Sequence, residues 1–440
     1  MEDWLKASAA DLGRDIEKGK IDPVELTEAH LSAIEKHPFA DRIYARLTET
    51  RARAEAKAAA DRAKRGLRRS PLDGVPISWK DLFDTAGTAT EAGSAFHKGR
   101  MPDADARVLA NATHAGLICL GKSQMTELAF SGLGLNPITA SPPCVNDHDA
   151  VSGGSSSGAA TSVAFGLAAA GIGSDTGGSV RIPSVWNDLV GLKTVSGRLS
   201  LEGVVPLCAR FDTVGPLCRS VEDASLLLAA MEIGKPADLT SASLQGVRFA
   251  ILKTSAFNGL EDTPRAAFDA AARRLQTAGA TVQDLNLPLI EKAMALAPTL
   301  FPAEAYATWR HRIEPDGDLM YPPVRNRFQQ GAATSAADFI VSWQKLDQIR
   351  LAYQDATSGF DAVILPSCPI LPPKIDAVTN DEEHFTERNL MALQNTRIGN
   401  LMGLAALALP TGTPSCGIML QGPNEERLLR LGAAVEAALS

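Results

Sequence analysis

The sequence predicts an α/β fold built in layers, and three observations lead to this prediction. Short apolar segments that suit buried strands alternate with longer segments whose apolar residues recur at helical spacing. Glycine, proline and aspartate stand at the borders between these segments, where turns are expected. The 440 residues are 45% hydrophobic and 21% charged, which is enough apolar material for one large domain or for two to three smaller ones.

The first part of the chain is predicted to be a layer of helices. Residues 3–66 are rich in helix formers, with a break at "GKID" before Pro23 and a long Ala/Arg/Glu run over residues 50–65. The pattern then changes, because "PLDGVPISWKD" has a turn at Asp73 and Gly74 followed by alternating apolar residues. We therefore expect a strand that ends at Lys80.

The rest of the chain alternates between predicted helices and strands. Residues 105–115 suit a helix and "LICL" suits a buried strand. The same order returns in "TPRAAFDAAARRLQTAGATVQDL", where Thr263 suits the N-cap, Pro264 the first helical position and Gly279 the end. Further strands are expected at "VRFAIL", "FDAVILP" and "LAALALP", and a last helix is expected after Asn424. No repeat of fixed period and no low-complexity linker divides the sequence.

Charge and cysteine content exclude several classes of partner. With 43 basic and 51 acidic residues the net charge is −8, so neither nucleic acid nor an anionic membrane surface is an expected partner. No apolar stretch approaches the roughly 20 residues of a membrane span, and the N-terminus has no apolar signal segment. Without C-x-x-C pairs, the six cysteines indicate reduced thiols in a cytoplasm rather than a disulfide framework or a zinc site. They are Cys119, Cys144, Cys208, Cys218, Cys368 and Cys416. We predict neither a cofactor nor a metal.

The stretch "GLICLGKS", residues 116–123, fits the phosphate-loop pattern G-x-x-x-x-G-K-[ST]. A phosphate loop needs flexible residues between its glycines, so that successive backbone N–H groups can turn toward the phosphate. Here the four residues are apolar and β-prone, which favours a core strand followed by a turn. We therefore expect Lys122 not to bind phosphate, and Ser123 to cap a helix through "QMTELAF".

A denser stretch, "GGSSSGAATSVAFGLAAAGIGSDTGGSVRIP", covers residues 153–183. Its pattern predicts a loop, a helix, a strand and a second loop that opens another helix at Ser179. Small residues let two backbones and a substrate approach one another closely. Thr176, Gly177, Gly178 and Ser179 could present free backbone N–H groups to a developing oxyanion, with the serine hydroxyl beside them.

The first loop of this stretch also fits a rival pattern. "GSSSG" matches G-x-S-x-G, the nucleophile elbow of α/β hydrolases, with Ser156 as the nucleophile. His311 or His384 would then serve as the base. The elbow follows an apolar strand, but "PPCVNDHDAV" precedes the loop here, so we keep this interpretation as the alternative.

Residues 153–184 resemble the amidase signature along their whole length, including Asp175, Ser179, Arg181 and Pro183. The resemblance extends to "DGVPISWKD" upstream, and to "VGLK", "FDTVGPLCRSVED" and "GLAALALPTG" downstream. It implies one amidase domain over residues 1–440, with a large mixed β-sheet covered by helices on both faces. Within it we expect an N-terminal helical layer (1–70), a catalytic core (71–235), a variable substrate-side region (236–360) and the C-terminal part of the core (361–440).

The resemblance also implies roles for particular residues. Ser179 would be the nucleophile, Ser155 the bridging serine and Lys80 the base, with residues 176–179 forming the oxyanion hole and a cis peptide between Gly154 and Ser155. A lysine can act as a base only while neutral, and burial can bring this about by lowering its pKa. Asp175 and Arg181 are expected to brace the loop as an ion pair.

Two departures from the family pattern bear on the subgroup. Thr194 follows "GLK" where many relatives have proline, and "WNDL" at 186–189 replaces a stretch of smaller residues. We favour a stand-alone amidase acting on a small amide over the alternative, a subunit of A type in the glutamyl-tRNA amidotransferase complex. The oligomeric state, a homodimer included, stays open. Specificity is expected to lie in residues 125–150 and 300–390, with the candidates Trp309, Arg310, Tyr321 and Arg325.

Overall fold

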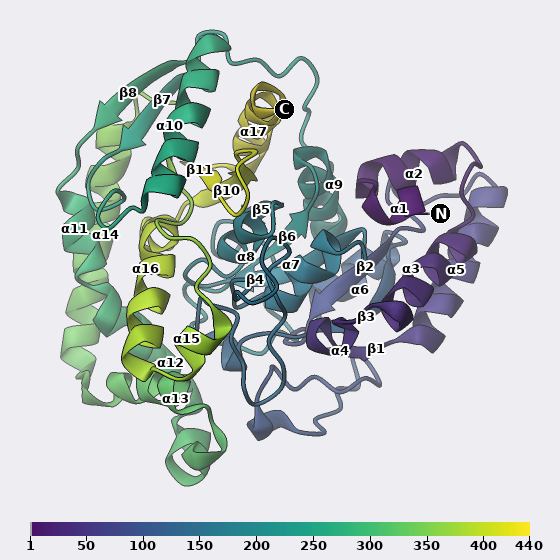
Figure 1. The fold of residues 1–440 in the computed structure, drawn as a ribbon, viewed down its shortest axis with the longest axis horizontal. Coiled ribbons are helices and arrows are strands. Elements are labelled where there is room, and N and C mark those ends of the chain that lie inside the picture. The colour runs from purple at the N-terminus through teal and green to yellow at the C-terminus, as the bar shows by residue number, and fades with distance from the viewer. Residues whose placement is uncertain (1) are drawn as a thin grey trace.

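Eleven strands form one continuous sheet in the computed structural model, which describes residues 2–440 (Figure 1). Their order across the sheet is β1-β3-β2-β4-β6-β5-β10-β11-β9-β7-β8. Strands β3, β2 and β4 run parallel to one another, as do β9, β7 and β8, while the strands between these groups pair antiparallel. The predicted fold class, a large mixed sheet with helices on both faces, is confirmed.

The N-terminal layer is helical except for one strand that the sequence did not predict. Its elements are α1 (Glu2–Lys6), α2 (Ala9–Glu17), α3 (Pro23–Lys36), α4 (Ala40–Ile43), β1 (Tyr44–Leu47) and α5 (Glu49–Lys64). Strand β1 pairs antiparallel with β3 and forms one edge of the sheet. The helices of this layer lie at that end of the sheet, on the right of Figure 1.

The central part of the chain supplies the middle of the sheet. It contains β2 (Pro76–Lys80), η1 (Ala95–His97), α6 (Arg107–His114), β3 (Ile118–Ser123), η2 (Glu127–Ala129), α7 (Ser157–Ala164), β4 (Ala170–Asp175), α8 (Arg181–Trp186), β5 (Val190–Lys193), β6 (Thr213–Cys218) and α9 (Val221–Glu232). The predicted strand ending at Lys80 and the predicted strand at "LICL" are confirmed.

The prediction of a helix after Ser123 is wrong. Ser123 is the last residue of β3, and only the single turn η2 follows. Leu128 and Ala129 adopt positive φ angles of 44° and 61°, which an α-helix cannot continue through. The N–H of Leu128 instead donates to the Ala92 carbonyl.

The remaining elements complete the sheet and add a group of helices beside it. They are β7 (Arg248–Leu252), α10 (Asp262–Thr277), β8 (Thr281–Leu285), α11 (Leu289–Met294), α12 (Ala297–Asp316), η3 (Gly317–Leu319), α13 (Pro322–Gln329), η4 (Gln330–Ala333), α14 (Ala336–Thr357), β9 (Ala362–Pro366), α15 (Ile375–Thr379), α16 (Glu382–Leu401), β10 (Ala405–Pro410), β11 (Gly417–Gly422) and α17 (Glu425–Leu439). Asn424 caps α17 as predicted, whereas Glu261, not Thr263, occupies the N-cap position of α10.

Helices pack on both faces because the strand residues alternate between them. Leu217 of β6 packs with residues of α7, whereas its neighbour Cys218 belongs to the cluster that includes the inner face of α9. Helices α7 and α8 therefore cover one face and α9 and α17 the other. No helix of the described residues is long and apolar enough to cross a membrane.

Candidate active site

Lys80 lies at the C-terminal end of β2, and its amino group points at two serine hydroxyls. Nζ donates to Ser155 Oγ at 2.7 Å and to Ser174 Oγ at 2.8 Å. Ser174 belongs to β4, which runs parallel to β2 with Trp79 opposite Ile172, so the ends of the two strands lie side by side. The pairing of β2 with β4 thus brings Lys80 next to Ser174, which the sequence pattern did not indicate, and Ser155 reaches Lys80 from the loop that precedes α7.

The Lys80 side chain is fully buried, and burial decides its protonation. Removal from water disfavours the charged form and lowers the pKa of Lys80 to about 7, against the opposing influence of the carboxylates of Asp175 and Asp212. A large fraction of the lysine is therefore neutral near pH 7. A neutral amine can donate to Ser174 and accept a proton from Ser155.

Glycines on β4 let the serine-rich loop sit directly on the strand. A Cβ on Gly173 would lie 2.5 Å from Ser156 Oγ, so any other residue there would push the loop away from the sheet. The Gly154–Ser155 peptide is cis, as the resemblance implies. These features hold Ser155 above the end of β4, within reach of Lys80.

The loop after β4 carries Ser179 and is braced by a buried ion pair. Arg181 donates through Nε and Nη2 to the two carboxylate oxygens of Asp175, both at 2.9 Å, and neither side chain is exposed. The same carboxylate accepts the backbone N–H groups of Gly178 and Val180 at 2.9 and 3.1 Å. The predicted ion pair is confirmed, and its carboxylate shapes the loop that presents the nucleophile candidate.

Helix α16 completes this support. Arg181 also donates to the Thr396 carbonyl at 2.7 Å and to Asn400 Oδ1 at 2.6 Å. Burial alone would raise the pKa of Asp175, but the Arg181 guanidinium outweighs it and holds that pKa well below its usual range. Asp175 is therefore a permanent anion whose role is to fix the loop.

The hydrogen bonds of the loop refine the expected oxyanion hole. The N–H of Gly178 is already donated to Asp175, whereas in the described residues those of Gly177 and Ser179 have no protein acceptor. Thr176 donates its hydroxyl to Asp212. In the described residues only the N–H of Gly178 among the four predicted backbone donors has a protein acceptor, so three are free for an oxyanion, and the assignment of residues 176–179 stays a prediction.

The loops of Ser155 and Ser179 lie side by side. The N–H of Ser156 donates to the carbonyl of Ser179 at 3.2 Å. In the described residues no direct hydrogen bond joins the hydroxyls of Ser155 and Ser179. The two catalytic candidates are thus neighbours, and a proton relay between them needs their hydroxyl groups to come within hydrogen-bond distance.

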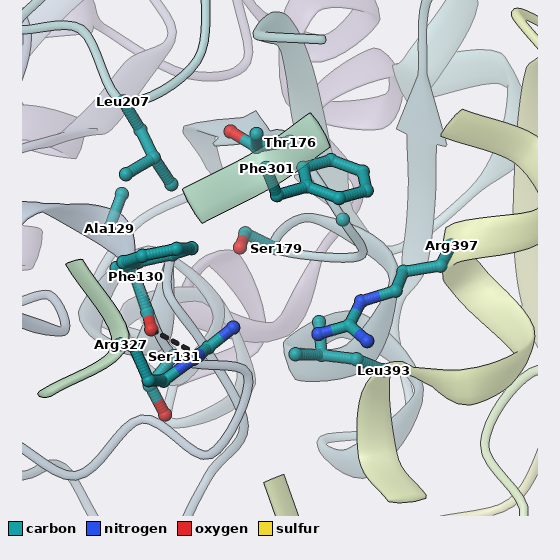
Figure 2. A pocket seen from close by; sticks show the side chains of 11 residues that line it. Ala129, Phe130, Ser131, Thr176, Ser179, Leu207, Phe301, Arg327, Leu393 and Arg397 are labelled. Carbon is teal, nitrogen blue, oxygen red and sulfur yellow. Dashed lines mark hydrogen bonds between the residues drawn. The ribbon is translucent and has the colours of Figure 1, made fainter. Parts of the chain in front are cut away.

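Ser179 opens into a pocket with an empty volume of about 310 Å³ that includes open solvent (Figure 2). The lining residues are Ala129, Phe130, Ser131, Thr176, Gly177, Ser179, Leu207, Phe301, Arg327, Leu393 and Arg397. Residues from the predicted specificity regions, 125–150 and 300–390, thus line the pocket, but they are not the four candidates that the sequence analysis named.

The four specificity candidates lie outside this pocket lining. Trp309 donates its indole N–H to the Pro206 carbonyl, Arg310 is exposed, and Arg325 pairs with Asp318. The backbone N–H of Tyr321 donates to Glu127. The two arginines that do line the pocket, Arg327 and Arg397, carried no local sequence signal, because neither belongs to a motif.

The rival nucleophile Ser156 is engaged elsewhere. Its fully buried hydroxyl donates to the Ser174 carbonyl at 3.2 Å and accepts the Ser174 N–H at 3.3 Å. His311 stacks on Trp309, and His384 lies beside Glu387 on α16, so neither contacts Ser156. The contacts of Ser156 are those of a structural residue.

Lys122 is likewise structural. It is fully buried in β3, where Nζ donates to Thr90 Oγ1 at 2.8 Å and lies 3.4 Å from Asp81 Oδ1. Residues 118–123 form a strand rather than a loop. The prediction that "GLICLGKS" is a core strand is confirmed.

Fold and site together define an α/β protein in which a buried lysine–serine pair adjoins a pocket that holds a second serine. The family model described as Amidase matches residues 25–429, and the chain therefore belongs to the amidase signature family. It is an amide-hydrolysing enzyme.

Relatives across this family resemble the chain over most of its length. It is 32% identical over 406 residues to 2-amino-5-chloromuconic acid deaminase of Comamonas testosteroni, covering 88% of this chain and 87% of that one. It is also 32% identical over 475 residues to the A-type subunit of the glutamyl-tRNA(Gln) amidotransferase of Anaeromyxobacter dehalogenans (strain 2CP-C), covering 98% and 95%. A crystal structure of an amidase superposes with a TM-score of 0.88 at 31% identity, covering 99% of this chain and 100% of the other.

Proposed function

We propose that the protein is an amidohydrolase that cleaves a small carboxylic amide to an acid and ammonia or an amine through an acyl-enzyme on Ser179. The observation that carries the proposal is the 2.7 Å contact between Lys80 Nζ and Ser155 Oγ, beside the loop that presents Ser179 to the pocket. Because burial lowers the pKa of Lys80 to about 7, the amine can serve as a base near neutral pH.

In the first step Ser179 Oγ attacks the amide carbon while its proton passes to Ser155, whose own proton passes to neutral Lys80. The carbonyl oxygen becomes an oxyanion, which the free N–H groups of Gly177 and Ser179 would stabilise. The protonated Lys80 then returns the proton through Ser155 to the amide nitrogen. The C–N bond breaks, ammonia or an amine leaves, and the acyl group stays on Ser179.

The second step repeats this transfer with water. Ser155 and Lys80 take a proton from the water as its oxygen attacks the acyl carbon. Collapse of the intermediate returns the proton to Ser179 Oγ and releases the carboxylic acid. The same two residues serve both halves of the reaction, so no further base is required.

A second candidate function is that of an A-type amidotransferase subunit, favoured by the likeness to the Anaeromyxobacter dehalogenans protein over 98% of this chain. Such a protein would hydrolyse glutamine only together with partner subunits and charged tRNA. The two candidates differ in what the isolated chain does.

The test is ammonia release by the purified chain alone from aliphatic, aromatic, dicarboxylic and urea-like amides, and from glutamine. Turnover without any other protein, abolished in Ser179→Ala, supports the stand-alone amidase. Activity only after addition of partner subunits supports the second candidate. Turnover that persists in Ser179→Ala contradicts the proposed mechanism.

We also propose a cytoplasmic location and a small-molecule amide, rather than nucleic acid, as the partner. All six cysteines are buried free thiols, which supports a reducing compartment. The division of the single domain at residues 70, 235 and 360 stays a prediction, and so does the oligomeric state.

A further inference from the structure

The pocket beside Ser179 contains two cationic side chains, Arg327 of α13 and Arg397 of α16. Figure 2 shows their guanidinium groups pointing toward each other from opposite sides of the pocket. The other lining residues are apolar or neutral, and no aspartate or glutamate is among them. One end of the pocket is therefore positively charged.

Neither arginine is neutralised by the protein. In the described side chains, no carboxylate lies within 4.0 Å of either guanidinium group. Arg327 donates to the Phe130 carbonyl and stacks 4.3 Å from the centre of the Phe130 ring. In the described residues the side chain of Arg397 makes no hydrogen bond, and its guanidinium group lies 5.9 Å from the centre of the Phe301 ring, so its donors are free for a ligand. In contrast, Arg181, the buried arginine behind the same loop, is fully paired with Asp175.

Both arginines are held in place by the structure around them. Thr396, the neighbour of Arg397, donates its hydroxyl to the Gly177 carbonyl at 2.7 Å and accepts Arg181 at its own carbonyl. Helix α13 is tied to the opposite wall because the Tyr321 N–H donates to Glu127 at 2.9 Å. Arg397 therefore belongs to a helix that is bound to the loop of Ser179, and Arg327 belongs to a helix that is bound to the segment of Glu127.

Two neighbouring cations without a counter-ion are unfavourable in a partly buried site. Burial, with the charge of Arg397 as a second cause, lowers the pKa of Arg327 to about 9, and burial lowers the pKa of Arg397 to about 10. Both remain charged at neutral pH. A bound anion would relieve their repulsion and use their free donors, and guanidinium groups match carboxylates in shape.

We propose that Arg327 and Arg397 together bind a carboxylate of the substrate, so that the enzyme selects small amides that carry a carboxylate and no ammonium group. The inference rests on the proposed function and narrows its substrate class. An ammonium group would find no partner in the pocket. The carboxylate behind Thr176, Asp212, already accepts from that hydroxyl and from the N–H groups of Leu207 and Cys208.

This selection predicts that free glutamine is a poor substrate, because its α-ammonium would lie among cations. The comparison that isolates charge uses amides of matched length: succinamate with a carboxylate, butanamide with a methyl group, and 3-aminopropanamide with an ammonium. We expect kcat/KM to fall in that order, with about tenfold or more between succinamate and butanamide. Glutaramate, which has one methylene group more than succinamate, tests the effect of chain length.

The variant Arg397→Met keeps most of the side-chain length and removes the charge. We expect it to lower the ratio of kcat/KM for succinamate over butanamide by about tenfold, mainly through KM. The matched control Arg310→Met removes an exposed arginine outside the pocket and should leave the ratio unchanged. An unchanged ratio in Arg397→Met, or a wild-type preference for butanamide or 3-aminopropanamide, overturns the inference.

A binding experiment covers the case in which Arg397→Met does not fold. In Ser179→Ala, which keeps both arginines, calorimetry should detect succinate binding that weakens with added salt, and no binding of 1,3-diaminopropane. Absence of succinate binding overturns the inference. Failure of the proposed function would give a different result from failure of this inference. If the proposed function were wrong, hydrolysis would persist in Ser179→Ala whatever the charge of the amide.

Discussion

Lys80 Nζ lies 2.7 Å from Ser155 Oγ although the two residues are 75 positions apart in the chain. No local sequence motif contains both residues. The parallel pairing of β2 with β4 brings Lys80 under the serine-rich loop, and glycines on β4 let that loop come down to meet it. The proposed catalytic pair therefore depends on a contact made by the sheet.

The activity should depend on the neutral form of Lys80. Because burial lowers its pKa to about 7, kcat/KM should rise with pH through about 7 and level off above it. Lys80→Ala should lose most activity and Lys80→Arg should do no better, since arginine stays protonated. His311→Ala and His384→Ala serve as controls. A rising limb that survives in Lys80→Ala and disappears in a histidine variant would restore the Ser156 alternative.

Burying Lys80 should also destabilise the protein in a pH-dependent way. Its folded pKa of about 7 lies below the ordinary value of 10.5, so between these values the unfolded chain binds more protons than the folded one. The wild type should gain stability as pH rises through this window, by at most about 1.4 kcal/mol per pH unit. Lys80→Met should therefore exceed the wild type in Tm most clearly below pH 7.

Thermal unfolding of both proteins from pH 6 to 10 measures this difference. Buried Lys193, whose pKa burial also lowers to about 7, is common to both and cancels in the comparison. A Tm difference that does not change with pH would show that Lys80 is charged in the folded protein throughout.

Breaking the ion pair behind the nucleophile loop should damage both stability and activity. Arg181→Met leaves the Asp175 carboxylate buried without its guanidinium partner, which should reduce the free energy of unfolding by about 3–5 kcal/mol. Activity of the remaining folded protein should fall because Arg181 no longer holds the carboxylate that accepts the N–H groups of Gly178 and Val180. Urea denaturation and kcat on the same preparation measure the two effects. A stable, fully active Arg181→Met would contradict the bracing role.

Lys122 should matter for folding and not for phosphate chemistry. Lys122→Met removes one of two cations beside buried Asp81, leaving Arg46, so we expect a loss of about 3 kcal/mol in the free energy of unfolding. The folded variant should hydrolyse amides within a few-fold of the wild type, and ATP should not stimulate either protein. ATP binding by the wild type that is lost in the variant would disprove this assignment.

The catalytic candidates could be predicted from sequence because their signals are local. Glycines and serines cluster around Ser155 and Ser179, and a short alternating segment ends at Lys80. The helical layer was predicted for the same reason, whereas strand β1 was not, because the four residues Tyr44–Leu47 are too few to show a period. The prediction of a helix after Ser123 was wrong because Leu128 and Ala129 adopt positive φ angles. Neither residue type favours such a conformation, so the residues did not indicate it.

The chemistry of the pocket could not be predicted in this way. Arg327 and Arg397 lie in ordinary helical segments and become neighbours only when α13 and α16 pack around the nucleophile loop. Ser174 was missed as a partner of Lys80 because it depends on the pairing of two strands. Trp309 and Arg310 lie in the correct region, but their side chains point into the core or to solvent.

The site of acylation during turnover is the most direct test of the proposed mechanism. Intact-mass analysis of the enzyme quenched during hydrolysis of its best amide, followed by peptide mapping, should show one acyl group on Ser179, and hydroxylamine should capture that group as a hydroxamate. Ser156→Ala should keep the adduct and most of the activity, and Ser179→Ala should lose both. An adduct on Ser156, or full turnover in Ser179→Ala, would contradict the mechanism.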